Sequence, residues 1–288
     1  MMKKCILLIL FIGFTTTGFS QFTKYERHRT RADISYKTLS DIPYYSEDVM
    51  KEDSYIREKC LLDIYYPETE KGFATVVWFH GGGLQGGDKT EEYPHLLKES
   101  GICIVNANYR MYPKAKCPDY LEDAAAAIAW TFRNIEKYGG DTALIFISGH
   151  SAGGYLTSMV GMDKKWLAAQ NIDANKIAGL IPMSGHTITH FKIREEKNIG
   201  YGQPVIDEYA PLYHVRADAP PLLLITGDRE LDMSGRYEEN AYMARMMKYN
   251  GHEKTYLFEL QGFNHEMEEP ASFALLEFIY KICQEKKK

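Results

Sequence analysis

Ser151 lies among small residues in the hexapeptide Gly149-His150-Ser151-Ala152-Gly153-Gly154. An apolar run over residues 143–148 precedes it, and a helix-like segment over residues 152–162 follows it. A serine on such a strand-to-helix turn is held in a strained backbone conformation, which requires small neighbours. The N–H groups and dipole at the start of the helix favour negative charge beside the hydroxyl. We therefore interpret Ser151 as a candidate nucleophile.

A serine hydroxyl needs a general base to make it nucleophilic. Of the nine histidines, His265 is best placed, because it follows a strand-like run over residues 254–262 and precedes a helix-like run over residues 270–288. The chain order serine, acid, histidine is the order found with a nucleophile turn of this kind. We expect His80 and His150, which belong to glycine-containing motifs, to shape loops.

Three carboxylates follow the strand-like run over residues 220–227: Asp228, Glu230 and Asp232. A carboxylate in this loop can accept the N–H of His265, fix its tautomer and stabilise the imidazolium. Only one of the three can occupy that position, and the residues themselves leave the choice open.

A glycine-rich motif, His80-Gly81-Gly82-Gly83, directly follows a buried strand-like run over residues 74–80. Three glycines let a loop present backbone N–H groups at close range. Together with the N–H of Ala152, such a loop forms an oxyanion hole. A phosphate-binding loop is the alternative, but neither Gly-Lys-Ser/Thr nor a Gly-x-Gly-x-x-Gly pattern follows.

Short apolar runs alternate with helix-like runs along most of the chain. The runs that we expect to be strands are 60–67, 74–80, 101–109, 143–148, 177–185, 220–227 and 254–262, and those that we expect to be helices are 118–140, 152–162, 236–251 and 270–288. This alternation predicts a mostly parallel sheet with helices on both faces. Residues 184–215 fit neither pattern and are expected to form a lid insertion over the carboxyl edge of the sheet.

The first twenty residues resemble a targeting segment. Lys3 and Lys4 precede an apolar run of ten, residues 5–14, and small residues stand three and one before a cleavage point at Gln21. This pattern predicts a signal peptide over residues 1–20 and a periplasmic or secreted protein. A membrane anchor would need about 20 apolar residues. We expect an N-terminal strap over residues 21–58 and one catalytic domain over residues 59–288.

Composition limits the kinds of partner. The 34 lysines and arginines include Lys3 and Lys4, so 32 would remain against 39 acidic residues after cleavage. An acidic balance of this kind attracts neither nucleic acid nor an anionic membrane surface. Four cysteines lie beyond the leader without metal-ligand spacing: Cys60, Cys103, Cys117 and Cys283. Export would permit a disulfide among them.

From Cys60 to the C-terminus, the chain resembles α/β-hydrolases of the hormone-sensitive-lipase and feruloyl-esterase-like (BD-FAE-like) group. The motifs that carry the resemblance, in family order, are "HGGGLQGGDK", "NANYRMYPKAKCPDYLEDAAAAIAW", "GHSAGG", "DAPPLLLITGD" and "GFNH". The resemblance implies an α/β-hydrolase fold, with a mostly parallel central sheet, helices on both faces and a small lid.

The resemblance also implies roles for individual residues. Ser151 would be the nucleophile and His265 the base, and the oxyanion N–H groups would come from Gly82, Gly83 and Ala152. In the family the acid usually stands three residues after the glycine that ends the strand. Glu230 occupies that position here and Asp228 has the usual side chain two positions earlier, so the prediction names both and leaves Asp232 as the outsider.

The expected function is that of a secreted serine carboxylesterase acting on short-acyl or aryl esters, including esters linked to carbohydrate. We expect no metal or organic cofactor, no nucleic-acid partner and no stable membrane anchor. Four tyrosines lie in segments that we expect to face the pocket: Tyr109, Tyr112, Tyr201 and Tyr213. Their rings could stack on a sugar or aryl group, but core packing explains most of them equally well.

Two alternatives share the same fold. One is an amidase or peptidase that uses the same three residues on a different bond. The other is a non-catalytic binding protein, as plant gibberellin receptors are. Those receptors lack the catalytic histidine, so His265 counts against this second alternative.

Overall fold

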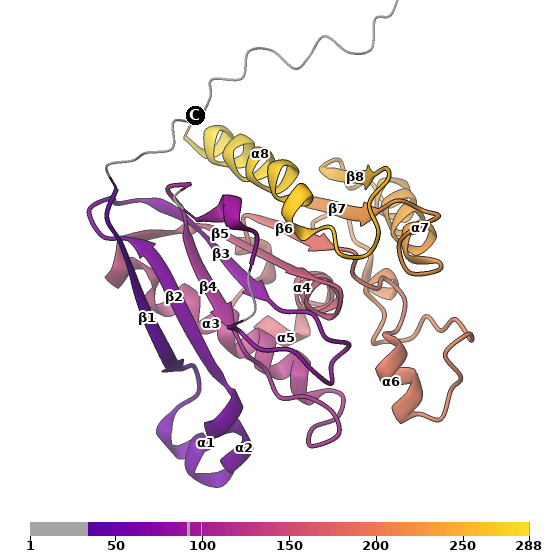
Figure 1. Cartoon of the computed structure of the whole chain (residues 1–288), viewed down its shortest axis with the longest axis horizontal. Coiled ribbons are helices and arrows are strands. Elements are labelled where there is room, and N and C mark those ends of the chain that lie inside the picture. The colour runs from indigo at the N-terminus through magenta and orange to yellow at the C-terminus, as the bar shows by residue number, and fades with distance from the viewer. Residues whose placement is uncertain (1–33, 91–92, 99, 288) are drawn as a thin grey trace, which may run out of the picture.

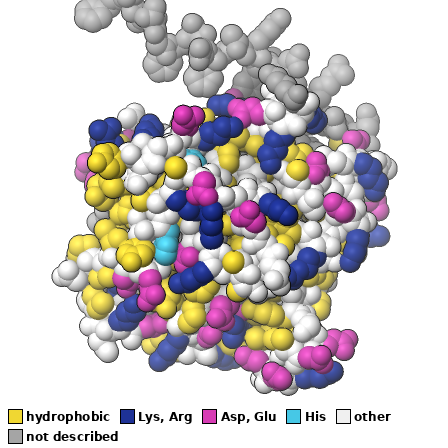
Figure 2. All heavy atoms as spheres, turned by 180° about the vertical axis from the view of Figure 1, so that it is seen from behind, with side chains coloured by type: hydrophobic (Ala, Val, Ile, Leu, Met, Phe, Trp, Pro, Cys, Tyr) yellow, Lys and Arg dark blue, Asp and Glu magenta, His cyan; other side chains and the backbone are white. Residues whose placement is uncertain are grey.

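The structure is a computed structural model that describes residues 34–90, 93–98 and 100–287. The predicted signal peptide and the first part of the predicted strap, residues 21–33, lie outside the described residues. No helix within the described ranges is long and apolar enough to cross a bilayer. Figure 2 shows basic and acidic side chains interspersed over one face of the molecule.

One eight-stranded sheet forms the centre of the protein (Figure 1), in the order β1-β2-β4-β3-β5-β6-β7-β8. Its strands are β1 (Tyr36–Pro43), β2 (Leu61–Pro67), β3 (Phe73–Phe79), β4 (Cys103–Ala107), β5 (Gly140–His150), β6 (Gly179–Met183), β7 (Leu222–Gly227) and β8 (Thr255–Leu260). Strand β2 runs antiparallel to β1 and β4, and the remaining pairs are parallel. The predicted mostly parallel sheet is therefore confirmed.

The central strands β3, β4, β6 and β7 are apolar except at Thr75, Asn106 and Thr226, because helices cover both faces of the sheet. Every residue of β3, β4, β6 and β7 is buried. The short strands thus read as nearly continuous hydrophobic runs, as is usual for parallel sheets.

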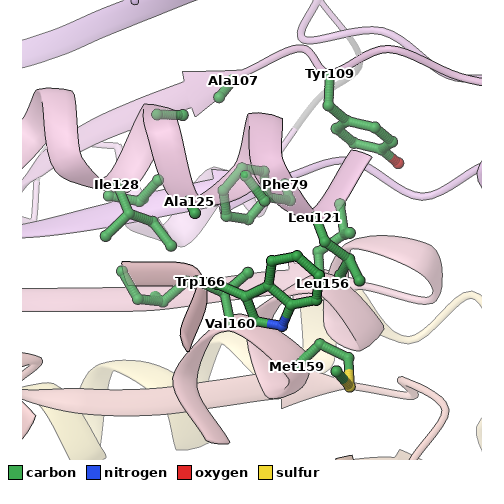
Figure 3. Packing of buried hydrophobic residues seen from close by; sticks show 14 of the residues in the cluster. Phe79, Ala107, Tyr109, Leu121, Ala125, Ile128, Leu156, Met159, Val160 and Trp166 are labelled. Atoms are coloured by element: carbon green, nitrogen blue, oxygen red, sulfur yellow. The ribbon is translucent and has the colours of Figure 1, made fainter. Parts of the chain in front are cut away.

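Helices and short 3-10 turns connect the strands. They are α1 (Glu47–Glu52), α2 (Ser54–Lys59), η1 (His95–Leu97), α3 (Asp119–Tyr138), α4 (Ala152–Met162), α5 (Lys165–Ala168), η2 (Ala174–Lys176), α6 (Phe191–Glu196), η3 (Pro211–His214), α7 (Arg236–Tyr249) and α8 (Glu268–Lys286). Helices α3, α4, α5 and α7 share one hydrophobic core with the sheet, and α8 shares a second core with the opposite face. Figure 3 shows the first core, where Phe79 of β3 packs near Leu121 of α3 and Leu156 of α4.

The described part of the predicted strap contains regular structure, namely strand β1 and helices α1 and α2. Residues Tyr36–Pro43 are an edge strand of the main sheet, with Tyr36 opposite Pro67 of β2 in the antiparallel register. Tyr44 then anchors the chain, since its buried hydroxyl donates to the carbonyl of Asn108 at 2.7 Å. The exposed face of β1 is polar, which is why the sequence reads as irregular although the backbone is paired.

The irregular segment 184–215 contains α6 and η3 and follows β6. Backbone hydrogen bonds close it on itself, from Thr189 N to Val205 O at 2.9 Å and from Leu212 N to Thr187 O at 2.8 Å. In Figure 1, α6 projects away from the sheet beyond the ends of the strands.

All four cysteines of the described residues carry free thiols.

Strand β5 and helix α4 approach the neighbouring strand so closely that two positions must be glycine. A Cβ atom on Gly149 would lie 2.5 Å from the carbonyl oxygen of Phe79, and one on Gly153 would lie 1.9 Å from the same atom. Both distances are far below van der Waals contact, and the obstructing atom belongs to the backbone of a central strand.

We therefore expect Gly153→Ala to lower the free energy of unfolding by roughly 1–3 kcal/mol, the usual effect of forcing an extra methyl group into a packed interior. Gly202→Ala is the matched control, because a Cβ there meets nothing within 4 Å. Urea unfolding monitored by circular dichroism measures both variants. Equal stability of the two variants would contradict the close approach of α4 to β3.

Candidate active site

Ser151 occupies the bend between β5 and α4. Its backbone angles, φ 53° and ψ −111°, lie in a region that side-chain-bearing residues rarely adopt. The bend is held from β6, because the Ser151 N–H donates to the Met183 carbonyl at 2.8 Å. Helix α4 begins at the next residue, so the Ala152 N–H is one of the four at a helix start that have no intrahelical acceptor.

His265 lies against Ser151, as the sequence predicts. Its Nε2 atom is 2.9 Å from the Ser151 Oγ atom. The histidine belongs to the loop between β8 and α8, and the carbonyl ends of parallel strands bring this loop and the nucleophile turn to the same edge of the sheet. The hydroxyl and the imidazole, 114 residues apart in the chain, are therefore within hydrogen-bonding distance.

The carboxylate beside His265 belongs to Asp232, so the prediction of Asp228 or Glu230 is wrong. Asp232 Oδ1 lies 2.7 Å from His265 Nδ1. Burial alone would raise the pKa of Asp232, but hydrogen bonds from His265, Ser184 and the Met233 N–H outweigh burial and hold this pKa below its usual range. Asp232 is thus ionised beside the imidazole.

The conformation of the loop after β7 explains why Asp232, and neither Asp228 nor Glu230, lies beside His265. The carbonyl of Asp228 accepts the N–H groups of both Leu231 and Asp232, so the chain makes a helical turn that carries Asp232 back under the end of β7. There the Gly227 N–H donates to Asp232 Oδ2 at 3.0 Å. Counting residues from Gly227 to find the carboxylate misses this turn, because the count does not show where the loop folds back.

The two rejected carboxylates have other positions. Asp228 caps two turns: one carboxylate oxygen accepts the Glu230 N–H at 2.9 Å and the other accepts the Gly262 N–H at 2.8 Å. These hydrogen bonds lower the pKa of Asp228. Glu230 is exposed on the outside of the loop.

Ser184, which the sequence did not single out, completes the surroundings of Asp232. Its Oγ atom lies 2.7 and 2.9 Å from the two Asp232 oxygens and 3.0 Å from His265 Nδ1. Ser184 follows β6 with φ 44°, a left-handed conformation that turns its hydroxyl toward the carboxylate. The only signal in the sequence is the Ser-Gly pair that ends the strand-like run.

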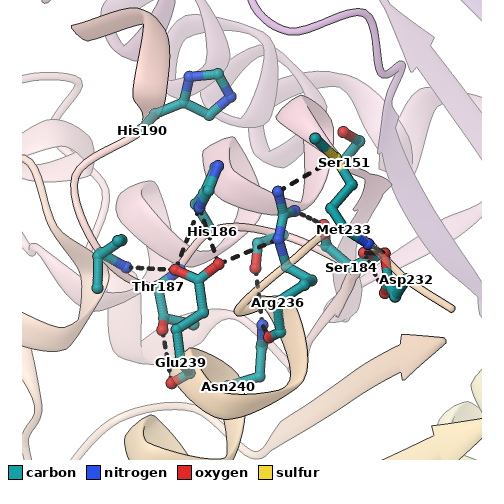
Figure 4. A network of polar contacts seen from close by, with 12 residues as sticks. Ser151, Ser184, His186, Thr187, His190, Asp232, Met233, Arg236, Glu239 and Asn240 are labelled. Atoms are coloured by element: carbon teal, nitrogen blue, oxygen red, sulfur yellow. Dashed lines mark hydrogen bonds and ion pairs between the residues drawn. The ribbon is translucent and has the colours of Figure 1, made fainter. Parts of the chain in front are cut away.

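A buried ion pair between Arg236 and Glu239 contacts the backbone of Ser184 (Figure 4). The Arg236 guanidinium is 1% exposed, donates to the Ser184 carbonyl and lies 3.1 Å from a Glu239 oxygen. Glu239 also accepts the N–H groups of Thr187 and Ile188 and lies 2.9 Å from His186 Nδ1. Burial raises the pKa of Glu239 to about 7 in spite of these donors.

The glycine-rich loop lies directly beside Ser151. A Cβ atom on Gly81 would be 3.6 Å from the Ser151 Cβ atom, and Gly82 and Gly83 have φ values of 97° and 64°. His80 holds the loop in shape by stacking on Tyr109, with ring centroids 4.4 Å apart. Burial lowers the pKa of His80 to about 4, so this imidazole is neutral at pH 7.

The four tyrosines expected near a substrate have different positions. Tyr109 is fully buried and donates to the His80 carbonyl, so its role is structural. The ring of Tyr112 lies under the Lys192 ammonium, 4.7 Å away. Tyr201 and Tyr213 are 60% and 62% exposed. The Tyr201 ring lies 5.5 Å from that of Phe191 at the start of α6, and the Tyr213 ring lies 5.1 Å from that of His214.

A family model described as BD-FAE matches residues 62–239, which include the glycine-rich loop, the nucleophile turn and Asp232. The chain belongs to the BD-FAE family. The sheet order and the position of Ser151 are those of an α/β-hydrolase fold, as the sequence predicts.

Two relatives from Mycobacterium tuberculosis are named as ester hydrolases. The probable carboxylic ester hydrolase LipM is 27% identical over 179 residues, which are 54% of this chain and 41% of LipM. Esterase LipC is 25% identical over 208 residues, which are 66% of this chain and 50% of LipC. The chain therefore spans no more than half the length of these relatives.

Two solved structures share the fold. A truncated carbohydrate esterase from gut microbiota has a TM-score of 0.69 and 17% identity, covering 86% of this chain and 96% of that one. Thermogutta terrifontis esterase 2, phosphoramylated by tabun, has a TM-score of 0.67 and 23% identity, covering 86% and 94%.

The geometry predicts which carboxylate supports the Ser151–His265 pair. We expect Asp232→Asn to lower kcat by roughly 10³–10⁴-fold, because an amide can hold the imidazole in the wrong tautomer and cannot stabilise the imidazolium. Asp228→Asn and Glu230→Gln are matched controls and should remain close to wild type. Initial rates on a nitrophenyl ester measure all three variants, and a large loss in either control with an active Asp232→Asn would contradict the geometry.

Proposed function

We propose that this protein is a secreted serine carboxylesterase that uses Ser151, His265 and Asp232. The observation that carries the proposal is the continuous hydrogen-bonded chain from the Ser151 hydroxyl through the His265 imidazole to the Asp232 carboxylate. This arrangement is the one in which an imidazole can remove a hydroxyl proton while a carboxylate stabilises the resulting charge. Membership of the BD-FAE family and the ester-hydrolase names of LipM and LipC support the same activity.

The proposed cycle has two halves. Ser151 Oγ attacks the ester carbonyl while His265 Nε2 takes its proton, and His265 then gives that proton to the departing alcohol. Water repeats the two steps on the acyl-enzyme and releases the acid. Asp232 holds the Nδ1 proton of His265 throughout and stays ionised.

The oxyanion of each tetrahedral intermediate needs hydrogen-bond donors that are already in place. We assign this role to the N–H groups of Gly82, Gly83 and Ala152. The Ala152 N–H stands at the start of α4, where the helix dipole adds favourable charge. The glycine-rich loop lies beside Ser151, since a Cβ atom on Gly81 would be 3.6 Å from the Ser151 Cβ atom, and this position favours the two glycine N–H groups as donors to the same oxygen.

The proposed substrate is a short-acyl ester linked to carbohydrate. The ring of Phe191, at the start of α6, limits the space beside the oxyanion loop, because a Cβ on Gly83 would lie 3.0 Å from its Cζ atom. The exposed ring of Tyr201 lies next to Phe191 and offers a face on which a sugar can stack. The structural relative described as a carbohydrate esterase, together with the predicted signal peptide, favours a substrate met outside the cytoplasm.

Covalent labelling tests the proposed nucleophile. We expect a fluorophosphonate probe to label the wild type in a single position and Ser151→Ala not at all, because only an activated serine reacts at a useful rate. Ser158→Ala is a control from the same helix, since its hydroxyl is buried and lies away from His265. An unlabelled wild type would overturn the enzyme proposal in favour of a binding protein, and faster turnover of an anilide than of the matching ester would favour an amidase.

A substrate series tests the proposed specificity. We expect kcat/KM to fall from nitrophenyl acetate to butyrate to a long-chain ester, and Tyr201→Ala to lower kcat/KM for an acetylated oligosaccharide by about 3- to 10-fold, the equivalent of one ring-stacking contact. The same variant should hydrolyse ethyl acetate, which has no ring to stack, at the wild-type rate. Tyr249→Ala, at an 82% exposed ring on α7, is the control. Preference for the long chain would contradict the short-acyl proposal.

A further inference from the structure

His150, the residue before the nucleophile, touches three separate segments of the proposed active site. Its Nε2 atom lies 2.8 Å from the main-chain carbonyl oxygen of His265, and the two imidazole rings have centroids 4.6 Å apart. Its Nδ1 atom lies 2.8 Å from a carboxylate oxygen of Glu268, the first residue of α8. A Cβ atom on Gly81 would lie 3.5 Å from the same Nδ1, so the ring also lies against the oxyanion loop.

The partners of this ring determine how many protons it carries. A carbonyl oxygen can only accept a hydrogen bond, so the Nε2 atom of His150 must be a donor. An ionised carboxylate also can only accept, so the Nδ1 atom must be a donor as well. A histidine whose two nitrogens both donate is an imidazolium, whereas a neutral histidine has one donor and one acceptor.

An ionised Glu268 is consistent with two protonated nitrogens on His150. Burial would raise the pKa of Glu268, but the hydrogen bond from His150 helps to outweigh burial and lower this pKa below its usual value. The His150 side chain is 10% exposed and that of Glu268 is 32% exposed, so the histidine is nearly buried and the carboxylate is partly open to solvent. The imidazole of His265 also faces the His150 ring, with centroids 4.6 Å apart. The neighbouring carboxylate, Glu269, points elsewhere and accepts the His95 N–H at 2.7 Å.

We propose that His150 is a doubly protonated imidazolium which, paired with Glu268, positions His265 through its main-chain carbonyl. This inference rests on the proposed function, because it gives His150 the task of aligning the general base. Asp232 fixes the ring of His265 by its Nδ1 atom, and His150 fixes the backbone that carries the ring. The Asp232 contact to the ring and the His150 contact to the backbone together hold the Nε2 atom of His265 toward Ser151.

Glu268 has a second effect on the reaction. His265 becomes positively charged when it takes the Ser151 proton, and a lone cation 4.6 Å away would oppose that charge. The carboxylate of Glu268 neutralises His150, so the hydrogen bond to the His265 carbonyl is kept without a net charge beside the general base. His150 is thus a positioning residue, since it acts only through His265.

The proton count can be measured without any substrate. We expect long-range ¹H–¹⁵N spectra of the full chain with ¹⁵N-labelled histidine, recorded at pH 7, to show both nitrogens of His150 protonated. Loss of the signals in His150→Gln assigns them. In Glu268→Gln the amide can donate to Nδ1, so we expect the ring to become neutral with one protonated nitrogen. A single protonated nitrogen in the wild type would overturn the proposal whatever the protein hydrolyses.

A compensating pair of substitutions tests the positioning. In His150→Gln the amide N–H₂ can still donate to the His265 carbonyl, but its oxygen then faces the Glu268 carboxylate, and we expect kcat to fall roughly 10- to 100-fold with KM unchanged. In the double variant His150→Gln/Glu268→Gln, the second amide donates to the first, which restores the order of donors and acceptors. We therefore expect the double variant to recover most of the lost kcat.

The matched control is Glu269→Gln, which removes an acidic residue from the same first turn of α8 without touching His150. It should keep the wild-type kcat. Equal losses in the single and double variants, with unchanged melting temperatures, would contradict the positioning role, because simple packing of the ring is not restored by a change at Glu268. A wild type that hydrolyses no ester would count against the proposed function alone, and the proton count would still decide the state of His150.

Discussion

The strained backbone of Ser151 is the constraint on which the rest of the structure depends. A non-glycine residue at φ 53° and ψ −111° costs about 1–3 kcal/mol and persists only where its surroundings fix it. Here the constraint comes from both sides: β6 accepts the Ser151 N–H, and α4 lies so close to β3 that only glycine fits at position 153. The geometry that projects the hydroxyl to the sheet edge is thus a property of the packed core.

The buried pair of Arg236 and Glu239 is likewise fixed by its surroundings. Arg236 and Glu239 are almost completely buried, and a buried charge is tolerated only when it is paired and hydrogen-bonded. Each of them also contacts the segment that follows β6, Arg236 at the Ser184 carbonyl and Glu239 at two backbone N–H groups. The ion pair therefore shapes the chain at the point where Ser184 meets Asp232, which explains why a costly buried pair lies so near the site.

Much of the fold could be predicted from the sequence. Strands β3 and β7 and helix α4 are found where the apolar runs and the glycine-rich turn place them, because burial on both faces of a parallel sheet leaves a direct pattern in the residue types. The short helices α1, α2, α5 and α6 were not predicted, and neither was strand β1, whose exposed polar face conceals its pairing with β2. An edge strand contributes hydrogen bonds more than apolar burial, and hydrogen bonds leave no pattern in the sequence.

The sequence by itself determined Ser151 and His265, because a nucleophile turn needs small residues at fixed local positions and the base follows in a fixed chain order. Only the tertiary structure decided which carboxylate lies beside His265, since the helical turn after β7 brings Asp232 there in place of two carboxylates that stand earlier in the loop. It also revealed Ser184 and the contacts of His150. Local backbone geometry is encoded in neighbouring residues, whereas the identity of a hydrogen-bond partner depends on how distant loops fold back upon one another.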